Sequence, residues 1–108
     1  MEVTNALQPD QCLGMEDIRV EIDLIDRAVI GLLGARYKYV MAAAKFKTSE
    51  TSVRAPERFK SMLAQRREWA SMDGLNPDAI EKLYSDLVNH FIEEELLRFQ
   101  KNELHPSR

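Results

Sequence analysis

The fold is decided by one run without proline, MEDIRVEIDLIDRAVIGLLGARYKYVMAAAKFK at residues 15–47. Its apolar residues recur at steps of three and four, the spacing of the helix face that packs on a core. They are Ile22, Ile25, Val29, Leu32, Tyr39, Ala43 and Phe46. Acidic residues are favourable at the positive end of a helix, and Glu16 and Asp17 stand there. We therefore expect a helix that begins at Met15–Asp17 and ends near Lys47.

The length of this helix bears on the assembly. About 32 helical residues span about 48 Å, whereas a compact chain of this size has a radius of gyration of about 13 Å. The helix therefore projects beyond a compact monomer, and its apolar stripe needs a cover. A second copy of the chain is the simplest cover and predicts an interlocked helical homodimer. The alternative is a helix that breaks near Gly34 and folds back as a monomeric four-helix bundle.

The rest of the chain predicts two more helices. Residues 1–14 contain Pro9 and Gly14 and are expected to be irregular. Pro56 suits the first turn of a second helix, and Gly74 suits its end. Asn76 followed by Pro77 is typical of an N-cap and the first residue of a third helix. The predicted order is helix 15–47, loop 48–54, helix 55–71 and helix 77–102, an all-α domain over 15–102 with a tail at 103–108.

Composition narrows the functional classes. The chain has 108 residues and a net charge of -3, so no basic surface for nucleic acid is expected. Cys12 is the one cysteine, which excludes an internal disulfide and a cysteine-based zinc motif. Apolar runs are too short to cross a membrane, and the N-terminus lacks the pattern of a signal peptide. We expect a cytoplasmic protein without a metal site.

Three cations interrupt or flank the apolar stripe. Arg36 follows Val29 by seven residues, and Lys47 lies 11 residues after Arg36, close to three helical turns. On one continuous helix both would share a face about 16 Å apart and bracket a small anion. Arg19 is 17 residues before Arg36, about 25 Å along the helix, and would reach that anion only from an antiparallel partner. The alternative is that all three are surface charges or members of ion pairs.

Glu95 is the fourth charged residue on an apolar face. It follows Phe91 by four residues on the third predicted helix. Burial of a carboxylate without a partner is costly, which points to a functional role. The alternative is a solvated position in the acidic run 93–95.

Three longer stretches are more specific: LGMEDIRVEIDLID at 13–26, YVMAAAKFKTSE at 39–50 and RAPERFKSML at 54–63. With them, residues 12–100 resemble the all-helical chorismate mutase family, and most closely its isochorismate-pyruvate lyase branch, which makes salicylate for siderophores. The resemblance implies the type II chorismate mutase fold. That fold is an intertwined homodimer of three-helix chains with two equivalent active sites.

The resemblance also implies roles for individual residues. Arg36 and Lys47 match the family's central substrate-binding cations, and Arg19 matches the arginine that the other protomer donates. Arg58 matches a further active-site arginine near a mobile loop. Because Lys47 stands at the entry to residues 48–54, we expect ligand binding to order that loop. The residues that match positions around the substrate ring are Val40, Met62 and Ile92.

Both reactions of this family are pericyclic and need no cofactor, metal or covalent nucleophile. The lyase eliminates pyruvate from isochorismate and leaves salicylate, whereas the mutase rearranges chorismate to prephenate. The site would act by restricting the substrate conformation and by placing positive charge at the ether oxygen. Lys47 is assigned to the ether oxygen. Arg19 and Arg36 are assigned to the two carboxylates, which suit the planar guanidinium fork.

Three positions bear on the choice of reaction. Ala55 and Phe59 stand where mutases of this family usually carry acidic residues, which favours the lyase. Glu95 departs from the lyase pattern, which has glutamine there; some mutases have glutamate. Because an ionised carboxylate offers no hydrogen-bond donor, Glu95 either acts while protonated or pairs with Lys47. The alternatives to a lyase with weak mutase activity are a chorismate mutase, a 4-amino-4-deoxychorismate mutase and a non-catalytic helical dimer.

Overall fold

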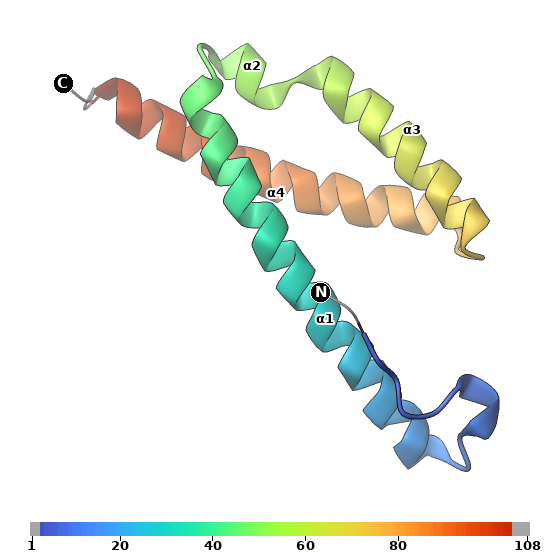
Figure 1. The fold of residues 1–108 in the computed structure, drawn as a ribbon. Helices are drawn as coiled ribbons and strands as arrows, with labels where there is room; N and C mark the ends of the chain where they lie inside the picture. The colour runs from blue at the N-terminus through green and yellow to red at the C-terminus, as the bar shows by residue number, and fades with distance from the viewer. Residues whose placement is uncertain (1–2, 105–108) are drawn as a thin grey trace. The chain divides into compact units, whose positions relative to one another are not determined.

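The computed structural model describes residues 3–104, which form helices and no strand. The chain divides into two compact units, residues 1–39 and 40–108. The prediction of an all-α fold with three long helices is confirmed. Figure 1 shows the elements, which in chain order are η1 (Pro9–Gln11), α1 (Met15–Ala43), η2 (Ala44–Phe46), α2 (Glu50–Arg54), α3 (Pro56–Met72) and α4 (Pro77–Leu104).

The first unit consists of most of α1 and the segment that precedes it. α1 has 29 residues and passes through Gly34 without a break, which contradicts the alternative of a helix that folds back there. The preceding segment runs beside α1 (Figure 1) and is attached through Glu21, which is only 8% exposed. The amide of Asn5 donates to its Oε2 at 2.7 Å, and the backbone N–H of Leu7 donates to its Oε1 at 3.0 Å. Two hydrogen bonds to one carboxylate therefore hold an otherwise irregular segment in place.

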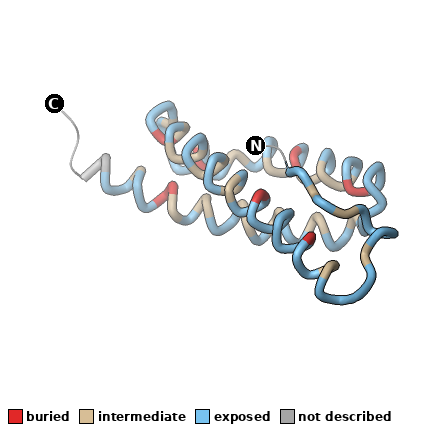
Figure 2. Tube along the Cα trace, turned by 60° about the horizontal axis from the view of Figure 1, so that its bottom comes forward, coloured by how far each residue is buried: buried red, intermediate tan, exposed pale blue. Residues whose placement is uncertain are grey.

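The apolar stripe of α1 is not buried within the chain. Its large aliphatic residues between Val20 and Leu32 are 43% to 62% exposed. These exposed aliphatic residues are Val20, Ile22, Leu24, Ile25, Val29, Ile30 and Leu32. Figure 2 shows long stretches of the helices as exposed, with buried positions scattered among them. The helix thus presents to solvent the residue types that normally form a core.

The second unit is built on α3 and α4, which pack against each other, with η2 and α2 also against α4. The buried apolar side chains of this unit are Ala44, Val53, Met62, Ala70 and Leu96. Gly74, with φ of 76°, lies in the turn after α3. The side chain of Asn76 accepts from the N–H of Ala79 at 3.0 Å, so the predicted N-cap of α4 is confirmed.

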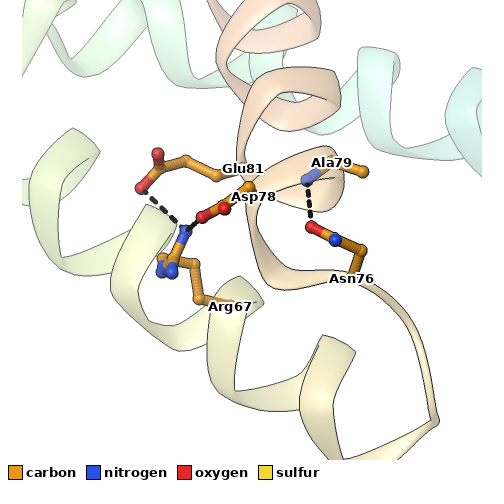
Figure 3. A network of polar contacts seen from close by, with 5 residues as sticks. All are labelled: Arg67, Asn76, Asp78, Ala79 and Glu81. Atoms are coloured by element: carbon orange, nitrogen blue, oxygen red, sulfur yellow. Dashed lines mark hydrogen bonds and ion pairs between the residues drawn. The ribbon is translucent and has the colours of Figure 1, made fainter.

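An ion pair joins α3 and α4 near the turn that connects them. Arg67 on α3 donates to Asp78 on α4 at 2.7 Å and lies 3.8 Å from Glu81 (Figure 3). These side chains are partly exposed, so the pairing contributes little to stability on its own. Its consequence is geometric, because it joins the two long helices near the turn.

Two predicted boundaries are wrong. The loop predicted at 48–54 contains α2, because Ser49 caps a helical turn with its side chain accepting from the N–H of Ser52 at 3.1 Å. α1 ends at Ala43 and not at Lys47, since the chain passes into a 3-10 turn and Lys47 has extended backbone angles. Lys47 and Arg36 therefore do not share a face of one continuous helix, contrary to the prediction from their spacing.

α4 is the last of the described helices. α4 continues to Leu104, two residues beyond the predicted end of the third helix, and residues 105–108 of the predicted tail lie outside the described part. Among the described helices, none combines the length and the apolar character that a membrane span requires. Among the side chains of residues 3–101, no group of three or more His, Cys, Asp or Glu is arranged to hold a metal ion.

Candidate active site

Glu95 is the most unusual ionisable residue of the second unit. It lies on α4 and is 4% exposed, so it is buried on the apolar side of this helix and is not the solvated position that the acidic run 93–95 left open. Within residues 3–104, its Oε2 has no hydrogen-bond partner. Burial raises the pKa of the carboxyl above its ordinary value, and the positive charge of Lys47 lowers this pKa by less. The pKa is therefore raised overall, and the carboxyl can donate a hydrogen bond whenever it is protonated.

Lys47 reaches this region because of the turn that follows α1. It is the C-cap residue of η2, and its backbone N–H donates to the carbonyl of Ala44 at 3.2 Å. Its half-buried side chain donates from Nζ to the backbone carbonyl of Ser52 at 2.9 Å. Since η2 and α2 both pack on α4, the ammonium group is held on the side of α4 that carries Glu95.

Sequence reasoning missed the serines that organise this segment. Ser49 and Ser52 cap each other at the start of α2. The signal was present as two serines three residues apart, the spacing of a capping box, with an acidic residue between them at position 50. A capping box usually ends in Glu or Gln, so Ser-x-x-Ser is a weak form of the pattern.

The predicted ring-packing residues occupy the same unit. Met62 on α3 is 3% exposed, and Ile92 on α4 and Val40 at the end of α1 are half-buried. Arg58 lies in the first turn of α3 and is exposed. The structure thus places six of the predicted site residues in one unit, five of them buried or half-buried and Arg58 exposed. The five are Val40, Lys47, Met62, Ile92 and Glu95.

Arg19 and Arg36 belong to the first unit. Arg19 is exposed, whereas Arg36 is half-buried and its Nη1 is shielded from solvent. Both lie on the continuous helix α1, 17 residues and therefore about 25 Å apart along the axis. A single chain does not bring these two guanidinium groups to one small molecule.

Comparison with known proteins gives concordant matches. The profile of the family described as chorismate mutase type II matches residues 18–96. The isochorismate pyruvate lyase of Pseudomonas aeruginosa is 41% identical over 88 residues, which are 82% of this chain and 87% of that protein. The T-protein of Haemophilus influenzae is 36% identical over 81 residues, or 74% of this chain and 20% of the T-protein. The T-protein of Enterobacter agglomerans is 38% identical over 65 residues, or 59% of this chain and 17% of that protein.

Proposed function

Because the chain belongs to the chorismate mutase type II family, we propose that it is an isochorismate pyruvate lyase that releases salicylate and pyruvate from isochorismate. The observation that carries the proposal is the 41% identity to the isochorismate pyruvate lyase of Pseudomonas aeruginosa over 82% of this chain, and the site adds a buried carboxyl, Glu95, on which the charge of Lys47 acts. While it is protonated, Glu95 would supply a hydrogen-bond donor beside the cation without adding a negative charge. A substrate with two carboxylates requires that balance.

The proposed reaction is a concerted hydrogen transfer within isochorismate. The ring C–H bond adjacent to the enolpyruvyl ether breaks, its hydrogen passes to the methylene carbon of the enolpyruvyl arm, and the C–O bond to the ring breaks. Pyruvate leaves and the ring becomes aromatic salicylate, so atoms balance without an added reactant. Lys47 and neutral Glu95 would stabilise the charge that develops on the ether oxygen as this bond breaks. The apolar surface of Val40, Met62 and Ile92 would hold the ring in a reactive conformation.

We assign the substrate carboxylates to Arg36 and to Arg19 of the partner protomer. The motif match supports this assignment, as does the separation of about 25 Å between these residues along α1. Arg58, exposed at the start of α3, would act at the mouth of the site. Guanidinium groups suit the task because each can bind a carboxylate through two parallel hydrogen bonds.

We also propose that the active form is a homodimer. The aliphatic residues of α1 between Val20 and Leu32 remain 43% to 62% exposed in the single chain. A second copy would cover this surface, and each apolar side chain that it fully buries would contribute about 1.5–3 kcal/mol before the cost of association. The same arrangement would supply Arg19 to the neighbouring site.

A chorismate mutase is the second candidate. Glu95 favours it, because glutamate occurs at this place in some mutases of the family while the lyase pattern has glutamine. Ala55 and Phe59, in contrast, occupy positions where mutases usually carry acidic residues. The 4-amino analogue of chorismate is a variant of the same candidate, since the conformational demands on the enolpyruvyl arm are alike.

The decisive experiment offers purified protein isochorismate and chorismate in separate assays. We expect salicylate, detected by its fluorescence, from isochorismate. Lys47→Met should lower kcat by about 10²–10³-fold, the usual cost of losing one transition-state contact. The matched control is Lys45→Met, which removes an exposed lysine whose Nζ lies 5.2 Å from the Phe46 ring centroid. Rapid prephenate formation without salicylate would identify a mutase, and inactivity toward both would leave the non-catalytic dimer.

A further inference from the structure

The hydroxyl group of Ser52 makes three hydrogen bonds within the turn that carries Lys47. It accepts from the backbone N–H of Thr48 at 3.2 Å and from that of Ser49 at 3.1 Å. It also donates to the carbonyl of Ser49 at 2.8 Å. One side chain therefore fixes the backbone of the two residues that follow Lys47.

The backbone of Ser52 is linked directly to Lys47. Its carbonyl accepts from Lys47 Nζ at 2.9 Å, and its N–H donates to the side chain of Ser49 at 3.1 Å. The Lys47 side chain is thus held at both of its ends. The backbone end is fixed through Thr48 and Ser49, and the charged end is fixed by the Ser52 carbonyl.

We propose that Ser52 is a positioning residue for Lys47 and holds its ammonium group toward Glu95, an inference that rests on the proposed function for its catalytic meaning. A long lysine side chain has many rotamers, and ordering it costs conformational entropy. The Ser52 hydroxyl shifts this cost to folding, so that the cation is already in place when substrate arrives.

Lys47 is the charged group through which a change at Ser52 would alter the pKa of Glu95. Lys47 stands at the end of η2 and is, in the described part of the chain, the group whose charge acts on the pKa of Glu95. On α2, Glu50 and Arg54 form an exposed ion pair with each other at 3.2 Å. On α3, Arg58 is exposed. Changes at Ser52 should therefore reach Glu95 through Lys47 and not through α2 charges.

The test measures the Glu95 carboxyl by NMR titration of the full-length protein labelled with ¹³C at glutamate, with the resonance assigned by its loss in Glu95→Gln. Ser52→Ala should raise the Glu95 pKa by about 0.5 pH unit, because the ammonium becomes mobile and its stabilisation of the carboxylate weakens. Lys47→Met should raise it further, by about 1 unit. Ser52→Thr keeps a hydroxyl and should restore the wild-type value.

A double-variant comparison separates positioning from general destabilisation. In the Lys47→Met background, Ser52→Ala should cause no further shift of the Glu95 pKa, because the cation through which it acts is gone. Thr51→Ala is the matched control, since it removes a neighbouring exposed hydroxyl from the same short helix. An equal shift in both backgrounds, no shift in either, or a lowered pKa in Ser52→Ala would each overturn the proposal.

Kinetics then distinguish this inference from the proposed function. With isochorismate, Ser52→Ala should lower kcat about tenfold, with KM changed less than about threefold, and Ser52→Thr should recover the loss. If the NMR shifts appear but neither isochorismate nor chorismate reacts, Ser52 still positions Lys47 and the proposed function is wrong. If wild-type protein makes salicylate and the NMR shifts are absent, the function stands and the positioning role is wrong.

Discussion

The positive charge of Lys47 acts on the carboxyl of Glu95 and lowers its pKa, while burial of that carboxyl raises the pKa by more. The two residues are 48 positions apart in the sequence and come together because η2 packs on α4. The net result is a carboxyl that stays protonated to higher pH than an ordinary glutamate does. While it is protonated it is a hydrogen-bond donor under the influence of a cation, which suits an ether oxygen that gains negative charge.

Activity should fall as pH rises through the raised pKa of Glu95, because the ionised carboxyl no longer donates and repels the substrate dianion. Glu95→Gln keeps a neutral donor at every pH and should flatten this decline. The measurement is kcat/KM for isochorismate from pH 5 to about 9. Glu93→Gln, an exposed neighbour on the same helix, should keep the wild-type profile. Identical profiles for wild type and Glu95→Gln would refute the donor role.

The same carboxyl predicts a pH-dependent stability. Its folded-state pKa lies above the ordinary value of 4.5, so the folded state binds the proton more tightly than the unfolded state does. Its contribution is fully present below pH 4.5 and is lost as pH rises through the folded pKa. Glu95→Gln should therefore be more stable than wild type at alkaline pH, by about 1–3 kcal/mol, with the difference shrinking in acid. Urea unfolding at fixed protein concentration measures this difference, and a constant difference would contradict it.

The regular parts of this molecule could be predicted from the sequence because each rests on a local pattern. The steps of three and four gave α1, and Asn76–Pro77 gave the start of α4. The end of α1 could not be placed, because Ala44 and Phe46 continue the apolar pattern although the chain has left the α-helix. The contact between Lys47 and Ser52 could not be predicted either, because it depends on the turn that Ser49 caps. In the sequence this turn appears only as a run of polar residues.

Ala55 offers a stability prediction that is independent of function. It joins α2 to α3 with φ of 41° and ψ of 61°, a left-handed conformation that costs a residue with a Cβ about 1–2 kcal/mol. Glycine adopts this conformation without strain but loses more freedom on folding. Ala55→Gly should therefore stabilise the protein by about 0.5–1 kcal/mol in urea unfolding. Ala64→Gly, at an exposed position within α3, should destabilise it by about 1 kcal/mol, and the same sign at both positions would contradict the argument.

Complementation between two inactive variants tests the shared site. If Arg19 acts in the partner's site, Arg19→Ala and Lys47→Met chains that are unfolded and refolded together should form heterodimers with one competent site each. Random pairing places half of the chains in heterodimers, so activity should return to about a quarter of the wild-type level. The control mixes Arg36→Ala with Lys47→Met. Since both residues are assigned to the same protomer's site, neither site of that heterodimer is complete, and no activity should return. Native mass spectrometry verifies that heterodimers form in both mixtures. No recovery in the first mixture would show that Arg19 does not cross the interface, and recovery in the control would show that Arg36 and Lys47 do not share one protomer's site.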